Sequence, residues 1–221
     1  MNGLSGRKTE FAEAEAGRAR PNRITTPRLE TVPLTLDEFA LYLADVDALA
    51  QKLRLREPPS EPDPETRVAF NWLFENALAL DAASQCWATL WLPILRSENR
   101  VVGGLCFKGP PRPLFDFLKT ESNFKIDVET GPFSALTAVV EIGYGVDEAF
   151  RGRGLATEAV GALLGWGRER EDVGAILAET LTANLPSRRV LEKCGFQRCG
   201  ESSDAVFWSV DVASESPNDA F

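Results

Sequence analysis

The stretch EIGYGVDEAFRGRGLATEAV, residues 141–160, joins a strand-like pattern to a helix-like pattern through a turn of arginines and glycines. Arg151, Gly152, Arg153 and Gly154 form that turn, and an apolar helical periodicity begins directly after it. The first N–H groups of a helix have no partner within the helix, and with the helix dipole they favour an anion. Glycine lets a phosphate approach the backbone because it has no Cβ. The pattern predicts a diphosphate-binding turn; the alternative is an ordinary turn with solvated arginines.

Two nucleotide-binding fingerprints are absent from this turn. The loop G-x-x-x-x-G-K-[ST] does not occur in the chain, and G-x-G-x-x-G fails at its third glycine, where Thr157 stands. The chain has no histidine, which excludes His-based triads and His-ligated metal sites. Acid–base chemistry must then fall to carboxylates, Cys, Tyr, Lys or water.

The strand before the turn carries two interior glycines, Gly143 and Gly145. Glycine inside a strand is typical of a bulge or of a close approach by another backbone. A bulge would turn backbone groups away from the sheet, where a ligand that bears amides could pair with them. Alternatively, the glycines make room for a neighbouring helix.

Two carboxylates occupy apolar strand patterns near the turn. Glu141 precedes the glycines, and Glu179 lies in the apolar run 174–181. A carboxylate in such a strand is costly unless paired, and burial raises its pKa towards neutrality, which suits a general base. We expect Glu141 first and Glu179 second as the base, and the alternative for each is a structural ion pair.

The composition fits a cytoplasmic globular protein, with 44% hydrophobic residues among 221. No apolar run approaches the ~20 residues of a membrane span, and the first residues lack the apolar centre of a signal peptide. The net charge of −9 argues against a nucleic-acid partner and suits a cationic acceptor. Cys194 and Cys199 form a lone C-x4-C, so no zinc site is expected.

Periodicity predicts both strands and helices in one domain over residues 23–212, with a disordered tail at 1–22 and a loose tail at 213–221. We expect strands at 28–34, 86–95, 100–109, 135–146 and 174–181, a closing hairpin at 196–212, and helices at 35–53, 65–82, after Gly154 and within 183–196. The segment 110–136 is a peripheral loop, a lid, an acceptor-side insert or a dimer contact. Both a monomer and a homodimer fit the sequence.

The chain resembles the GNAT superfamily of acetyl-CoA-dependent N-acetyltransferases, most of all its ribosomal-protein N-terminal acetyltransferase branch. The superfamily loop [R/Q]-x-x-G-x-[G/A] reads here Arg151-Gly-Arg-Gly154-Leu-Ala156, and VEIGYGV matches the strand before it. NLPSRRVLEKCGF matches the branch segment N-x-x-S-x-x-x-L-x-K-x-G-F. The resemblance covers roughly residues 24–212.

The resemblance implies an α+β fold around a twisted, mostly antiparallel sheet that is splayed at its central strands. Acetyl-CoA would enter between strands 138–146 and 174–181, without a metal, and its acetyl group would pass directly to an amine of a small molecule or a protein N-terminus. Asn184 would also reach the thioester, and the alternative for Lys193 is a solvated helix lysine. The implied coenzyme contacts are Ile142, Gly143, Tyr144, Gly145, Val146, Arg151, Gly152, Arg153, Gly154, Leu155, Ala156, Thr157, Asn184, Ser187 and Lys193.

One departure from the superfamily concerns the proton donor. Many members carry a tyrosine four residues before the Gly-Phe pair, and that position is Leu191 here. Cys194 is not expected to act as a nucleophile, since the superfamily transfers directly. The missing tyrosine keeps a second hypothesis, a protein that binds acyl-CoA as a sensor without turnover.

Overall fold

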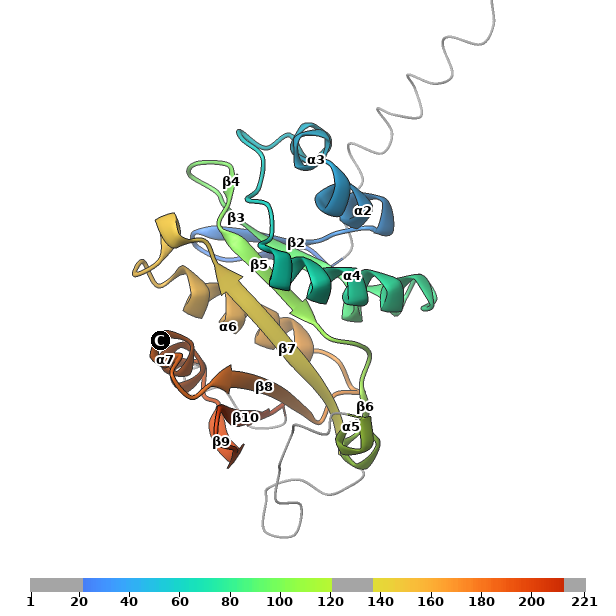
Figure 1. The fold of residues 1–221 in the computed structure, drawn as a ribbon, viewed down its shortest axis with the longest axis vertical. Helices are drawn as coiled ribbons and strands as arrows, with labels where there is room; N and C mark the ends of the chain where they lie inside the picture. The colour runs from blue at the N-terminus through green and yellow to red at the C-terminus, as the bar shows by residue number, and fades with distance from the viewer. Residues whose placement is uncertain (1–21, 121–136, 213–221) are drawn as a thin grey trace, which may run out of the picture.

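A computed structural model describes residues 22–120 and 137–212 and places their strands in one twisted sheet with helices on both faces (Figure 1). The strands are β1 (Ile24–Thr25), β2 (Leu29–Pro33), β3 (Leu90–Leu95), β4 (Arg100–Val101), β5 (Gly103–Phe107), β6 (Arg112–Pro113), β7 (Ala138–Val146), β8 (Ala175–Leu181), β9 (Gln197–Glu201) and β10 (Ala205–Asp211). The helices are α2 (Leu36–Ala44), α3 (Val46–Leu53), α4 (Pro64–Leu78), α5 (Leu114–Thr120), α6 (Leu155–Arg168) and α7 (Leu185–Lys193), with short 3-10 turns η1 (Gln85–Trp87) and η2 (Glu148–Phe150).

The strands follow the order β1-β2-β3-β5-β7-β8-β10-β9, with β4 beside β3 and β6 beside β7. Neighbouring strands are antiparallel except for β7 and β8, which are parallel. The predicted mixed, mostly antiparallel sheet is therefore confirmed. The parallel pair needs a crossover connection, and α6 supplies it.

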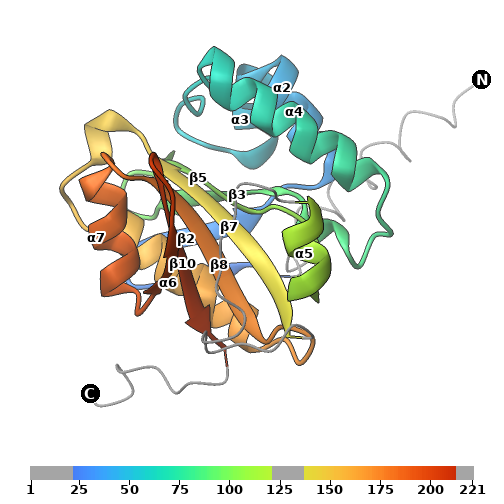
Figure 2. The same ribbon diagram turned by 60° about the horizontal axis from the view of Figure 1, so that its bottom comes forward.

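Helices cover the two faces of the sheet unequally. α6 packs its apolar stripe against one face, with Leu191 of α7 in the same core. On the other face, α2 and α4 cover the β2–β3 end, and α5 covers the β7–β8–β10 end. Figure 2 shows α2, α3 and α4 on one side of the sheet and α6 on the other. The middle of the face that α4 and α5 share is left partly open.

Several predicted helices and strands are shorter than expected or divided in two. The helix predicted over 35–53 is wrong as a single element, because Asp45 ends α2 and its carboxylate accepts the Ala48 N–H (2.9 Å) to begin α3. The strand at 86–95 begins only at Leu90, after η1. The strand at 100–109 is interrupted before Gly103, whose φ is +152°.

The start of α2 and both ends of α7 lie where their capping residues predicted them. Thr35 caps α2 in a reciprocal arrangement with Glu38. Pro186 lies in the first turn of α7, and Gly195 follows the helix with a φ of +86°. The predicted loop at 110–136 contains α5, and its residues 121–136 lie outside the described residues. Within the described ranges, no helix is long and apolar enough to span a membrane.

Candidate active site

β7 and β8 pair over only part of their length. Pairing runs from Val139–Ala175 to Ile142–Ala178, and then β7 continues beside β5 while β8 continues beside β10. The two central strands therefore part at Ile142, and the separation implied by the resemblance is confirmed.

The backbone of Tyr144 and Val146 faces the gap between the parted strands. The Lys108 N–H donates to the Glu141 carbonyl (2.9 Å), and the Asp147 N–H donates to the Val102 carbonyl (3.0 Å). The N–H and C=O groups of odd-numbered residues in β7 thus point towards β5. Those of even-numbered residues, which include Tyr144 and Val146, point towards the gap. An extended ligand that bears amides could pair with β7 here.

The glycines of β7 do not form the predicted bulge. Residues 142–146 pair with 107–103 in an unbroken register, so the gap arises because β8 turns away. A Cβ on Gly143 would lie 3.2 Å from the Cys106 sulfur, whereas a Cβ on Gly145 would meet nothing within 4 Å. Gly143 therefore makes room for Cys106, and Gly145 leaves the strand surface bare.

The predicted diphosphate turn has the backbone shape that its glycines allow. Gly152 and Gly154 have φ values of +73° and +74°, a region in which L side chains are strained. Gly154 is the N-cap of α6 and supplies no side-chain acceptor. Thr35, Asp45, Asp63 and Asn184 cap the starts of α2, α3, α4 and α7 with their side chains. The first N–H groups of α6, on Leu155, Ala156 and Thr157, are thus left for a ligand or water.

The two arginines of the turn point to different places. Arg151 is exposed, and its Nε donates to the Val146 carbonyl (3.1 Å) at the open end of β7. Arg153 stacks over Phe150, with 5.5 Å from its guanidinium carbon to the ring centroid, and its guanidinium lies 3.5 Å from a Glu98 oxygen. Arg151 is therefore the better placed of the two to meet an anion that extends into the gap.

An ion pair that the sequence analysis did not identify supports the turn from behind. Glu158, in the first turn of α6, accepts hydrogen bonds from the Thr26 hydroxyl (2.6 Å), the Arg28 N–H (2.9 Å) and the Arg28 Nε (2.5 Å). Arg28 also donates to the Arg153 carbonyl (2.8 Å). Burial alone would raise the pKa of Glu158, but these hydrogen bonds hold it below its ordinary value. The charge of Glu158 is thereby compensated in the first turn of α6, close to the uncapped N–H groups.

Glu141 is buried, as predicted, and its carboxylate forms an ion pair with Lys108 of the loop after β5. The Glu141 side chain is 3% exposed and that of Lys108 is 42% exposed. Burial tends to lower the pKa of Lys108, yet the carboxylates of Glu141 and, more weakly, Glu179 raise it above its ordinary value. The structure therefore contains the alternative weighed for Glu141, an ion pair, with a lysine that sequence reasoning did not select.

Glu179 does not lie in the buried environment that the sequence predicted. It is exposed near the end of β8, beyond the last residue that pairs with β7. Alternation along the parallel pair puts Glu179 on the same face of the sheet as Glu141, two positions beyond its register partner Leu177. Glu141, Lys108 and Glu179 therefore gather on one face around the gap.

The start of α7 closes the opposite side of the gap. Asn184 caps α7 by accepting the Ser187 N–H (3.2 Å), and the Ser187 carbonyl accepts the Tyr144 hydroxyl (2.9 Å). Burial raises the pKa of Tyr144 to about 12. Lys193 is exposed at the far end of α7, so the structure does not bring it together with Asn184 and Ser187.

Leu191 and Cys194, near Lys193, are unsuited to chemistry. Leu191, at the position of the missing tyrosine, is fully buried. Cys194 is a free thiol packed against the core, and burial raises its pKa to about 11, which disfavours a thiolate nucleophile. Within the described residues, no group of three or more His, Cys, Asp or Glu side chains is placed to hold a metal ion.

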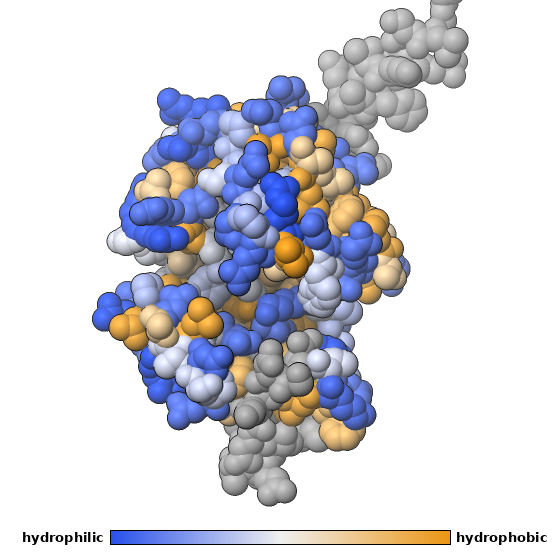
Figure 3. All heavy atoms as spheres, viewed as in Figure 1, coloured by the Kyte–Doolittle hydropathy of each residue, from blue (hydrophilic) through white to orange (hydrophobic). Residues whose placement is uncertain are grey.

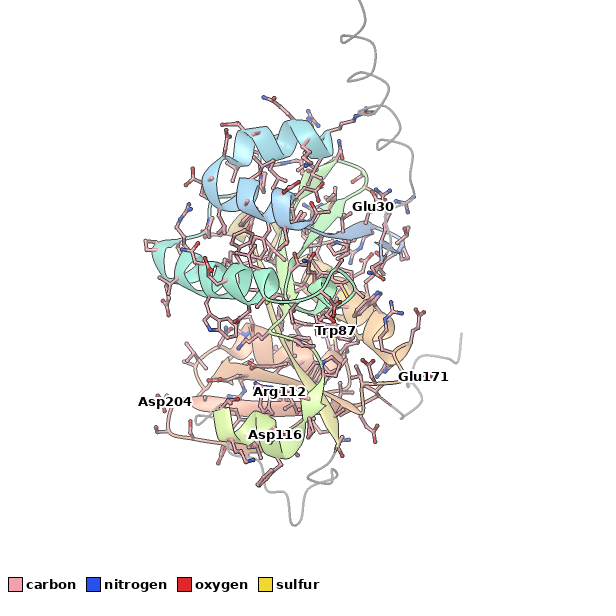
Figure 4. All side chains as sticks on the ribbon, turned by 90° about the vertical axis from the view of Figure 1, so that its right-hand side faces the viewer. Glu30, Trp87, Arg112, Asp116, Glu171 and Asp204 are labelled. Carbon is pink, nitrogen blue, oxygen red and sulfur yellow. The ribbon has the colours of Figure 1, made fainter. Side chains whose placement is uncertain are left out.

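A cavity of about 970 Å³ opens on the face that carries Lys108 and Gly143. It lies between α4, the loop before α4, β5 and the second half of β7, and it reaches Arg151. Figure 3 shows a hollow across the middle of this face. In Figure 4, α4 and the α5 helix that carries Asp116 lie on the same side of the sheet at different heights. We call this space the α4 cavity.

A family model described as an acetyltransferase (GNAT) domain matches residues 28–197. The chain belongs to the GNAT acetyltransferase family. The family implied by the turn and the strand before it is therefore confirmed.

Relatives and solved structures agree with this assignment. The chain is 28% identical over 118 residues to an uncharacterized N-acetyltransferase of Bacillus subtilis, YjdG, and the match spans 53% of this chain and 56% of that relative. A ribosomal-protein-S5-alanine acetyltransferase from Vibrio fischeri is 15% identical with a TM-score of 0.54, and the match covers 88% of this chain and 99% of that one. RimL, a ribosomal L7/L12 alpha-N-protein acetyltransferase in complex with coenzyme A, is 18% identical with a TM-score of 0.54 and coverage of 88% and 100%. At these identities the two structures show a shared fold.

Proposed function

We propose that this protein is an acyltransferase that moves an acetyl group from acetyl-CoA directly to a primary amine. The observation that carries the proposal is the uncapped start of α6, with two left-handed glycines, at the end of two parted strands. A helix start binds a diphosphate through N–H groups and its dipole, and parted strands leave amides free for pantetheine. The RimL structure, which shares this fold, contains coenzyme A.

Most of the predicted contacts have a role in this proposal, and Lys193 has none. The amides of Gly152, Arg153, Gly154 and the residues that follow to Thr157 hold the diphosphate, and Arg151 adds charge. The peptide groups of Tyr144 and Val146, with Ile142 at the fork, pair with pantetheine. Asn184 retains an amide N–H₂ that can donate towards the thioester, since its oxygen caps α7.

The reaction needs a neutral amine, because an alkylammonium has a pKa of about 10 and no lone pair for attack. The amine nitrogen bonds to the thioester carbon, the carbon–sulfur bond breaks, and the sulfur leaves as a thiolate that takes up a proton. A carboxylate on the gap face accepts the amine proton directly or through water. We propose Glu179, which is exposed, and Glu141, which is paired with Lys108, as the two candidates for this role.

Calorimetry and turnover together test the proposal. Acetyl-CoA should bind with measurable heat, and free coenzyme A should appear when amines are added. Glu141→Gln and Glu179→Gln should each be measured across pH, and the variant that loses the acidic limb of the rate profile identifies the proton acceptor. If acetyl-CoA gave no heat at millimolar concentration, the proposal would be wrong.

A binding protein without turnover is the second candidate. The buried Leu191 favours it, because no phenol stands where many family members carry their proton donor. Heat on addition of acetyl-CoA, with no coenzyme A released by a broad amine panel, would support a sensor and exclude the transferase.

A further inference from the structure

We propose that the α4 cavity binds the acceptor and selects a primary amine carried on an aromatic or similarly apolar body. The inference rests on the proposed acetyl transfer and adds the chemical class of the acceptor. The cavity is lined by Lys108, Gly143 and Tyr144, so it adjoins the fork at which the strands part. A ligand in it would present its amine to the gap face that also carries Glu179.

The outer wall of the cavity is an apolar surface that the fold itself leaves uncovered. Val68 and Trp72 are 69% and 50% exposed, lie four residues apart on α4, and both line the cavity. Large exposed apolar side chains that line a concave site are typical of ligand-binding surfaces. Trp72 offers an aromatic face against which an aromatic ring could pack.

Hydrogen bonds between residues that line the cavity join distant parts of the chain. Tyr42 donates its hydroxyl to the Ser60 carbonyl (3.2 Å), and the Ser60 hydroxyl donates to Asp147 after β7 (2.9 Å). The loop before α4 is thus fixed to both α2 and the end of β7. The cavity is therefore preformed, and it requires little ordering when an acceptor binds.

The charges that line the cavity favour a cation. Five lining residues are acidic and two, Lys108 and Arg151, are basic. Lys108 is already paired with Glu141. The five acidic residues are Glu61, Asp63, Glu65, Asp147 and Glu148. An ammonium is attracted to such a lining, and an acceptor that also carries a carboxylate or phosphate is repelled.

The apolar wall formed by Val68 and Trp72 and the acidic lining together distinguish classes of acceptor. A polyamine would satisfy the acidic lining but would leave Val68 and Trp72 in water. An amine with an aromatic body satisfies both. That body can come from a small arylalkylamine or from the first residue of a peptide, and both sources present the same ammonium and ring.

The test is a comparison of acceptors with the full chain and acetyl-CoA. We would measure coenzyme A release with 2-phenylethylamine, a tripeptide amide that begins with Phe, spermidine and free phenylalanine. 2-Phenylethylamine or the peptide should exceed spermidine and phenylalanine at least tenfold in kcat/KM, and the better of the two identifies the source. Higher kcat/KM for spermidine, or for free phenylalanine, would overturn the inference.

Matched variants test whether Trp72 is responsible for the preference for an aromatic amine. Trp72→Ala should raise the KM for the aromatic amine about three- to tenfold and leave the KM for acetyl-CoA unchanged, whereas Trp72→Phe should retain most of the preference. Leu78→Ala is the control, because Leu78 is 52% exposed on the same helix and does not line the cavity. Equal effects of Trp72→Ala and Leu78→Ala would refute the assignment. Turnover of spermidine alone would overturn the acceptor class and leave acetyl transfer standing, whereas absence of coenzyme binding would remove both.

Discussion

The ion pair between Lys108 and Glu141 makes an asymmetric prediction about stability. The carboxylate is 3% exposed, whereas the ammonium is 42% exposed. Lys108→Met removes the cation from a carboxylate that water can scarcely reach, so less of the desolvation cost of that carboxylate is offset. Glu141→Gln removes the buried charge and leaves an ammonium that solvent can hydrate.

The magnitudes follow from these exposures. Loss of one partner from a fully buried pair costs about 3–5 kcal/mol, and an exposed pair is worth about 0–1 kcal/mol. Because Lys108 is screened by solvent, we expect about 2 kcal/mol for Lys108→Met and about 1 kcal/mol or less for Glu141→Gln. For a domain of this size, these values correspond to Tm losses of about 4–8 °C and at most about 4 °C.

Thermal unfolding of both single variants and the double variant measures the asymmetry. Lys108→Met/Glu141→Gln should be more stable than Lys108→Met alone, since the buried charge is then gone. The pKa of Lys108 is raised above its ordinary 10.5 in the folded protein. The stabilisation by its ammonium is therefore complete below that value and is lost only as pH rises through the folded pKa. The Tm difference between the wild type and Lys108→Met should be constant from pH 7 to 9. If Glu141→Gln destabilised the protein as much as Lys108→Met, this account of the pair would be refuted.

Three further predictions concern the coenzyme site. Gly154→Val forces a β-branched residue to a φ of +74° and should weaken acetyl-CoA binding at least tenfold by calorimetry, whereas Gly161→Ala, whose added Cβ meets nothing within 4 Å, should leave the affinity unchanged. Arg28→Ala leaves Glu158 without its cationic partner at the helix start where we propose that the diphosphate binds, and it should lower coenzyme affinity about three- to tenfold. Arg28→Ala/Glu158→Gln should restore most of that affinity, and no recovery in the double variant would contradict the electrostatic explanation. Because the pKa of Tyr144 is about 12, Tyr144→Phe should leave the shape of the rate profile unchanged between pH 6 and 10, and a lost limb in that range would show that the phenol titrates there.

The sequence by itself determined the features that depend on neighbouring residues. Two glycines and the helical pattern after them predicted the turn at residues 151–154, because only glycine adopts its positive φ values without strain. Thr35, Pro186 and Gly195 marked helix ends through capping and φ preferences that act within a few residues. The alternation and length of apolar runs were sufficient for most strand positions, whereas the mixed sheet was expected from the family resemblance.

The tertiary structure alone decided which distant residues meet. Lys108 and Glu141 are 33 residues apart and meet through the register of β5 and β7. Arg28 and Glu158 are 130 residues apart and meet because α6 packs against the sheet beside the start of β2. Glu179 sits in an apolar run, yet it is exposed because β8 leaves β7 after Ala178. Local patterns fix backbone conformation, but the burial and charge environment of a side chain depend on packing between elements, which no single stretch of sequence contains.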